Sequence, residues 1–294
     1  MSASTLSDHE IASLADSHDI ITTGMLADEA RRRLHGLRTT FVRVATLSLE
    51  GGPPACPPGA GELRIIGRPS ARSAAVGRVQ ATAAVARGVP VSGFSLADLE
   101  RLAAAEGATL RSLLEELSAA GLELVAEAAF DTLQDPRRSI EEVNIAGLSL
   151  ARLTVHQLPS SDVVSFYRRI ADLQRTVAVV RAFAPLPRSL NAAVPTTGYD
   201  DVKRLALARL IVDNVGSIQV DWALYGPKLA QVALTVGADD IDGVSPSDDA
   251  SEGRRRSALE EIRRHIAAAG QEPIERNGRF EVQGPSTDAA RRLR

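Results

Sequence analysis

The stretch GYDDVKRLALARLIVDNVGSIQVDWALYGPKLAQVALTVGADDIDGV, residues 198–244, decides the fold. Its apolar residues first recur at helical spacing and then, over residues 217–222, alternate with polar ones as in a strand. A second helix is predicted over residues 227–236, with proline in its first turn, and residues 238–243 open another strand. Helices alternating with strands that end in polar side chains are typical of a (β/α)8 barrel.

The same alternation runs through most of the chain. Eight strands are expected, at residues 39–50, 62–67, 89–94, 122–127, 149–156, 177–186, 217–222 and 238–243. They predict an α/β fold, a (β/α)8 TIM barrel, for which 294 residues are a suitable length. We expect a lead-in over residues 1–24, one barrel domain over 25–281 and a flexible tail over 282–294.

Composition excludes several classes of function. The net charge is −3 and the pI is about 6.0, so no basic bias points to a nucleic-acid partner. No apolar run is long enough to span a membrane, and the polar N-terminus does not resemble a secretory signal. The expected location is therefore cytoplasmic, and the expected partner is a small-molecule substrate.

The chain has a single cysteine, Cys56, in the loop GGPPACPPGAGE over residues 51–62. One cysteine excludes a disulfide within the chain and a cysteine-rich metal site, and no metal-binding set of other residues stands out. Only about a dozen residues separate the first two strands, which is the minimum for a crossover with a helix. We therefore expect the first loop and helix of the barrel to be reduced.

Several blocks resemble the radical S-adenosylmethionine (SAM) enzymes of the futalosine route to menaquinone, namely aminofutalosine synthase and cyclic dehypoxanthine futalosine synthase. The matching blocks are DDVKRLALARLIVDN, SIQVDW, GPKLAQVAL, GADDIDG and LEEIRRHIAAAGQEPIERNGRF. The resemblance covers roughly residues 25–281. It implies a barrel of radical SAM type and a place in menaquinone biosynthesis.

The resemblance also implies cofactors that this chain is not expected to hold. The family binds a [4Fe–4S] cluster through a C-x-x-x-C-x-x-C motif after the first strand, and SAM beside it. This chain has only Cys56 there, and it lacks the family's glycines in the fourth strand, AGLELVAEAAF over residues 120–130. A [4Fe–4S] cluster needs several thiolates, so no cofactor is expected from this chain itself.

Candidate site residues come from the ends of the expected strands, which face the mouth of such a barrel. His156 ends the fifth strand, matches a family histidine, and has a side chain suited to proton transfer near neutral pH. Arg181 and Arg188 bracket the sixth strand's end, and either could hold a carboxylate or a phosphate-like group. The predicted catalytic residues are His156, Asp221 and Glu127, and the predicted substrate-binding residues are Arg181, Gln219, Trp222, Asp240 and Asp242. The alternative for His156 is a polar residue at a strand end that holds a loop, and for Glu127 a strand-end carboxylate in solvent. For the arginines it is a solvated side chain.

Three functional hypotheses remain open at this point. The first is a cluster-less homologue that binds a polar pathway intermediate, of futalosine type or an aromatic acid, or that partners a true radical SAM enzyme. The second is a non-radical acid/base enzyme that uses His156 with Asp221 or Glu127. The third is an active transferase of the aminofutalosine synthase kind that borrows its cluster from a second chain.

Overall fold

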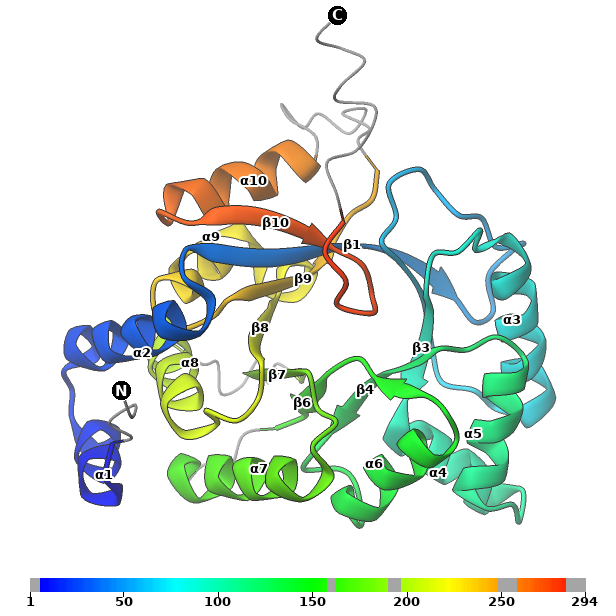
Figure 1. Cartoon of the computed structure of the whole chain (residues 1–294). Helices are drawn as coiled ribbons and strands as arrows, with labels where there is room; N and C mark the ends of the chain where they lie inside the picture. The colour runs from blue at the N-terminus through cyan, green and yellow to red at the C-terminus, as the bar shows by residue number, and fades with distance from the viewer. Residues whose placement is uncertain (1–5, 158–161, 190–196, 248–257, 284–294) are drawn as a thin grey trace, which may run out of the picture.

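A computed structural model of the chain describes residues 6–157, 162–189, 197–247 and 258–283. Its parallel strands close into a barrel, because β1 (Arg38–Ser48) pairs with both β2 (Glu62–Ile66) and β9 (Asp240–Val244). Between them run β3 (Val91–Ser95), β4 (Leu124–Ala129), β5 (Ser149–Leu150), β6 (Leu153–Val155), β7 (Ala182–Pro187) and β8 (Ser217–Asp221). The short strands β5 and β6 both pair with β4 and together occupy the position of the fifth barrel strand. The predicted (β/α)8 barrel is confirmed (Figure 1).

Helices surround the barrel. They are α1 (Asp8–Asp16), α2 (Ile20–His35), α3 (Arg72–Val85), α4 (Leu96–Ala105), α5 (Leu110–Ala119), α6 (Pro136–Ile145), α7 (Val163–Val177), α8 (Gly198–Ile211), α9 (Trp222–Leu234) and α10 (Ala258–Ala268). Residues 49–61, between β1 and β2, contain no helix, as the spacing of the two strands predicted. Among the described residues, no helix is both long enough and apolar enough to cross a membrane.

Strand alternation separates two kinds of side chain. In β2, Leu63 and Ile65 are buried apolar residues, while Glu62 and Arg64 make polar contacts inside the barrel. Neighbouring residues of a strand point to opposite faces, so the apolar pair packs outward under the helices and the charged pair points inward. The interior of this barrel is consequently rich in charge.

Two expectations about the strands were wrong. The sixth strand does not begin at residue 177, because α7 extends to Val177 and ends at Ala178, whose φ is 52°; β7 begins at Ala182. A further strand, β10 (Glu272–Arg276), was not expected at all, and it pairs in parallel with Arg38–Val42 of β1. One edge of β1 pairs with β9. The other edge is shared by two strands: β10 pairs with the first half of β1, and β2 pairs with the second half. The C-terminal segment thus completes the barrel wall beside β1.

Candidate functional site

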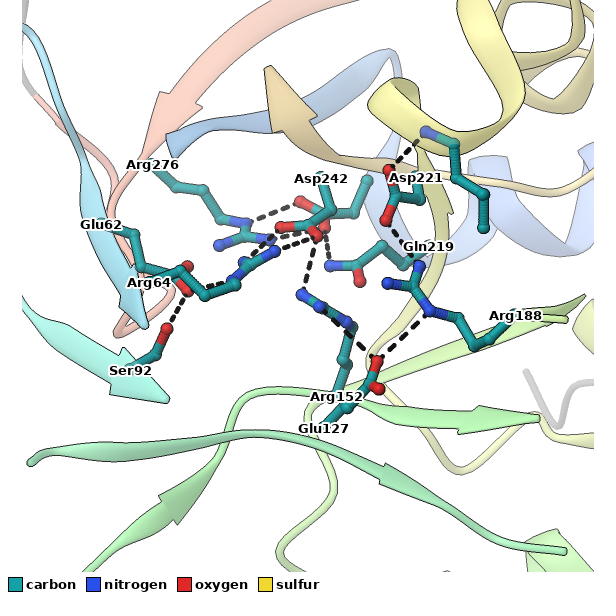
Figure 2. Close-up of polar contacts among 12 residues, drawn as sticks. Glu62, Arg64, Ser92, Glu127, Arg152, Arg188, Gln219, Asp221, Asp242 and Arg276 are labelled. Atoms are coloured by element: carbon teal, nitrogen blue, oxygen red, sulfur yellow. Dashed lines mark hydrogen bonds and ion pairs between the residues drawn. The ribbon is translucent and has the colours of Figure 1, made fainter. Parts of the chain in front are cut away.

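The carboxylate of Asp242, on β9, lies inside the barrel and forms ion pairs with two arginines (Figure 2). Arg64 donates from Nη1 and Nη2 to the two Asp242 oxygens at 2.8 Å each, and from Nε to Glu62 Oε1 at 2.8 Å. Ser92 donates to the same Glu62 oxygen. Burial alone would raise the pKa of Asp242, but the guanidinium groups of Arg152 and Arg64 outweigh it and hold that pKa well below its ordinary value. Asp242 is therefore a permanent anion that organises arginines around it.

A second buried pair lies beside the first. Arg276, from β10, donates from Nε and Nη2 to the two oxygens of Asp240 at 2.6 Å each. Gln219 Nε2 donates to Asp240 Oδ2 at 2.6 Å, and Thr40 Oγ1 donates to Oδ1 at 2.5 Å. Every oxygen of this carboxylate is thus occupied by protein donors, which suits a structural role in the barrel wall.

Arg152 is less completely bonded. It lies between β5 and β6, its side chain is 4% exposed, and Nη1 donates to Asp242 Oδ2 at 2.7 Å. Its Nε is buried without a hydrogen-bond partner in the part of the chain that the structure describes. Burial and then the nearby Arg64 guanidinium lower the pKa of Arg152, although Asp242 opposes them. The negative charge near the Arg152 guanidinium is therefore too small to offset its burial and the repulsion from Arg64.

A third cluster crosses the mouth of the barrel (Figure 2). Arg188, just after β7, donates from Nη1 to Asp221 Oδ2 at 2.5 Å. Asp221 ends β8 and also caps α9 by accepting from the Leu224 N–H at 2.9 Å. Glu127 Oε2, on β4, lies 3.2 Å from Arg188 Nε and 3.8 Å from Arg152 Nη2. Arg188 therefore bridges two carboxylates above the buried pairs.

A cavity of about 580 Å³ opens at the carboxyl ends of the strands, above this cluster. Its polar lining includes Arg64, Arg68, Asp98, Glu127, Arg152, Arg188 and Asp221. It shares Ser95, Asp98, Glu127 and Arg188 with a groove of about 1180 Å³ beside α4 and α6. We call the first space the mouth cavity and the second the side groove. The mouth cavity has the size of a small-molecule site and lies where barrel folds carry out their chemistry.

The predicted site residues do not all meet there. Glu127 and Asp221 line the mouth cavity, while Gln219, Asp240 and Asp242 are buried among the ion pairs of the interior. His156 is exposed and borders the side groove, where its backbone N–H donates to Asp131. The structure therefore brings together two of the three predicted catalytic residues.

The last two predicted residues lie apart from the mouth cavity. Trp222 packs edge-on against His265, with ring centroids 5.4 Å apart, beside a separate cavity of about 920 Å³ between α9 and α10. Arg181 precedes β7, at the opposite end of the barrel, and donates to the Arg279 carbonyl at 2.6 Å. It lies there because β7 starts later than expected, so residue 181 is at the beginning of the strand.

Sequence reasoning missed Arg64, Arg152 and Arg276. A signal was present for Arg64 and Arg152, because an arginine within an otherwise apolar strand segment must find a buried carboxylate. Arg276 gave no such signal, because its segment EPIER does not read as a strand. Arg188 was noted as a carboxylate holder but was not placed among the predicted binding residues. These arginines supply the positive charge of the interior and the mouth.

The family's cluster does not fit the donor set of this chain. Cys56 is half-buried, with Sγ 3.8 Å from the Ala86 carbonyl oxygen, and it is the only cysteine of the sequence. Within the described ranges, no group of three or more His, Cys, Asp or Glu side chains is arranged to hold a metal ion. One thiolate cannot replace the several that a [4Fe–4S] cluster requires.

Residues 185–288 match the family model of the CofH/MqnC C-terminal region. The predicted resemblance is confirmed. The futalosine-enzyme relatives include aminodeoxyfutalosine synthase of Streptomyces coelicolor, 37% identical over 33% of this chain and 27% of that protein. The enzyme of the same name from Thermus thermophilus is 27% identical over 66% of this chain and 60% of its own length. The matches thus span less than two thirds of these two relatives.

Two further comparisons concern the fold and a related activity. A 5-amino-6-(D-ribitylamino)uracil–L-tyrosine 4-hydroxyphenyl transferase of Archaeoglobus fulgidus is 26% identical over 69% of this chain and 68% of its own. The crystal structure of methylornithine synthase superposes with a TM-score of 0.65 at 12% identity, covering 92% of this chain and 94% of that one. At that identity the structural likeness concerns the barrel alone.

Proposed function

We propose that this protein is a cluster-less homologue of the futalosine-route enzymes that binds a polar intermediate of that route in the mouth cavity. The observation that carries the proposal is a charged cavity at the carboxyl ends of the strands in a chain with one cysteine. The blocks that resemble the family fall mainly on α8, β8, α9, β9, α10 and β10. Among them, Asp221, Asp240 and Asp242 hold the arginines of the interior and the mouth.

The proposed activity is binding, because the chain provides no ligand set for a radical-generating cluster. The ligand is a futalosine-type compound or an aromatic acid, since both are small polar molecules of the size that this cavity admits. The biological role of this binding would then be to deliver the ligand to a radical SAM enzyme of the same route. In that case the two proteins interact directly.

One observation favours a second candidate function, non-radical acid/base catalysis. Glu127 and His156 border the same side groove, and Glu127 also borders the mouth cavity. A ligand that reached from the cavity into the groove would lie between a carboxylate and an imidazole. Such a pair can remove a proton at one atom and deliver it at another.

Calorimetric titration of the purified protein with futalosine, dehypoxanthinyl futalosine and enolpyruvyl-benzoate tests the proposed function. We expect at least one of them to bind with micromolar affinity and without turnover. In parallel, anaerobic treatment with iron and sulfide should leave no cluster absorbance and no affinity for SAM. The proposal would be refuted if a stoichiometric cluster formed. It would also be refuted if no compound bound and pull-downs captured none of the route's enzymes.

A co-expressed pair of this protein and a radical SAM enzyme of the route tests the borrowed-cluster alternative. Iron and sulfide are measured in the purified pair and in the partner alone. An excess of iron in the pair would support a cluster shared between the chains. Equal iron in both samples would leave this protein as the ligand-binding member.

A further inference from the structure

The interior arginines differ in how many of their donors are used. Arg64 and Arg276 each donate hydrogen bonds from Nε, Nη1 and Nη2. Toward the described residues, Arg152, although equally buried, donates only from Nη1, and Arg188 makes its hydrogen bond from Nη1 as well. A buried guanidinium that leaves most of its donors unused is costly. Both partly used arginines line the mouth cavity.

Among the described residues, no further carboxylate oxygen accepts a hydrogen bond from Arg152. Both oxygens of Asp242 already accept from Arg64, and one of them also accepts from Arg152. Glu127 Oε2 is the next nearest, yet it lies at ion-pair distance from Arg152 and Arg188 and accepts a hydrogen bond from neither. Glu127 therefore supplies charge without the forked hydrogen bonds that guanidinium groups favour.

We propose that the mouth cavity recognises a monoanionic carboxylate through Arg152 and Arg188, and that Glu127 is the internal counter-charge that this carboxylate displaces. The inference rests on the proposed function in one respect, that the mouth cavity binds a small molecule. Glu127 borders both spaces, so its side chain has room to turn from the mouth cavity into the side groove. The ligand's carboxylate then takes the hydrogen bonds that Glu127 leaves unmade.

The charges around the mouth cavity select a single negative charge on the incoming group. The charged lining of the mouth cavity has four guanidinium groups, of Arg64, Arg68, Arg152 and Arg188, against three carboxylates, of Asp98, Glu127 and Asp221. A dianionic phosphate in the place of Glu127 would add a second negative charge beside Asp221 and Asp242, which already pair with Arg188 and Arg152. A carboxylate that replaces Glu127 leaves the balance unchanged. It also matches the planar fork of a guanidinium better than a phosphate does.

The experiment compares acids with their uncharged isosteres on the full-length protein. Benzoate, benzamide and phenyl phosphate are titrated calorimetrically, beside the pathway compounds named above. We expect benzoate to bind at least about tenfold more tightly than benzamide or phenyl phosphate, a difference of about 1.4 kcal/mol. Arg152→Lys should remove most of the preference for the acid. Arg175→Gln, which alters a surface arginine with 64% side-chain exposure, is the matched control.

Glu127→Gln separates the counter-charge role from a ligand-contacting role. Removing a competing carboxylate should tighten benzoate binding by about fivefold or more, because the ligand no longer displaces an anion. Weaker binding in this variant, or equal affinity for benzoate and benzamide in the wild type, would overturn the inference. If Arg152→Lys does not fold, the wild-type comparison and Glu127→Gln still decide the question.

The outcomes also distinguish this inference from the proposed function. Benzoate binding with the stated selectivity, but no binding of any pathway compound, would leave the inference standing and remove the proposed function. If pathway compounds bound with the same affinity after amidation of their carboxylates, the proposed function would stand and the inference would be refuted. If none of the probes bound, both the inference and the proposed function would be refuted.

Discussion

Arg276 and Asp240 form a two-pronged ion pair inside the barrel, with Nε and Nη2 each 2.6 Å from a carboxylate oxygen. Both side chains are at most 2% exposed. Arg276 ends β10, and Asp240 opens β9, so the pair joins the two strands that flank β1. The contact fixes the C-terminal segment in the barrel wall.

Replacing Arg276 should therefore unfold the protein more easily. Arg276→Leu leaves a buried carboxylate without its counter-charge, which we expect to lower the free energy of unfolding by about 3–5 kcal/mol. Urea unfolding measures it, with the exposed Arg175→Gln as a control that should change stability by less than about 1 kcal/mol. The double variant Arg276→Leu/Asp240→Leu should recover much of the loss. A single variant as stable as the control would contradict this account.

The acid sensitivity of the protein should depend on Asp242. Its pKa in the folded protein is lowered by Arg152 and Arg64 despite its burial, so its stabilising effect is complete above the unfolded value of about 4 and is lost as pH falls below it. We expect the wild type to exceed Asp242→Asn in unfolding free energy by a constant amount between pH 5 and 7. The gap should shrink at pH 3. A gap that stays constant down to pH 3 would show that other groups govern acid unfolding.

Gly243 should be intolerant of a side chain, because it supports the floor of the mouth cavity. Its φ is +74°, and an added Cβ would lie 3.1 Å from Asp221 Oδ1. Gly243→Ala should cost about 1–2 kcal/mol for the backbone conformation and also disturb the contact between Asp221 and Arg188. Thermal unfolding and benzoate titration read the two effects separately. Gly77→Ala, in α3 with open space around its Cβ, should be neutral or stabilising.

His156 should be dispensable for binding in the mouth cavity. It lies in the side groove, and the described contacts hold it through its backbone N–H and carbonyl rather than through its ring. His156→Ala should change the affinity for benzoate by less than about twofold. If a pathway compound is turned over, the same variant should abolish that turnover. A tenfold loss of benzoate affinity would instead place the ligand across both spaces.

Cys56 should have no part in metal binding. Cys56→Ser is expected to lower the unfolding free energy by no more than about 1 kcal/mol, because the side chain is half-buried and packs against the core. Iron content after reconstitution should be equally low in the variant and the wild type. Cluster absorbance that is present in the wild type and lost in Cys56→Ser would refute the cluster-less interpretation.

The order of strands and helices could be predicted from the sequence where periodicity and breakers agree. Residues 217–221 alternate and form β8. The helix predicted from Pro227 is the second part of α9, which begins five residues earlier, at Trp222, and is interrupted at Gly226. The prediction failed at Val177, because an apolar run near a helix end reads equally well as a strand. It failed again at β10, whose sequence EPIER contains a proline and three charges and lacks the pattern of a strand.

The site was predictable only in part, for a different reason. Glu127 and Asp221 could be placed at the mouth because strand ends define it. Arg64 could not be matched to Asp242, because the two are separated by 178 residues and the pairing depends on the closed barrel. Charge pairing across a barrel is a property of the assembled ring and not of any local segment.

The position of β10 has a consequence for synthesis on the ribosome. A chain emerges from its N-terminus, so β1 is made long before its partner strands β9 and β10. Until then, one edge of β1 has no partner at all, and the start of its other edge waits for β10. Unpaired edges are templates for aggregation. The nascent chain therefore carries an unpaired strand edge on β1 until β9 and β10 have been made.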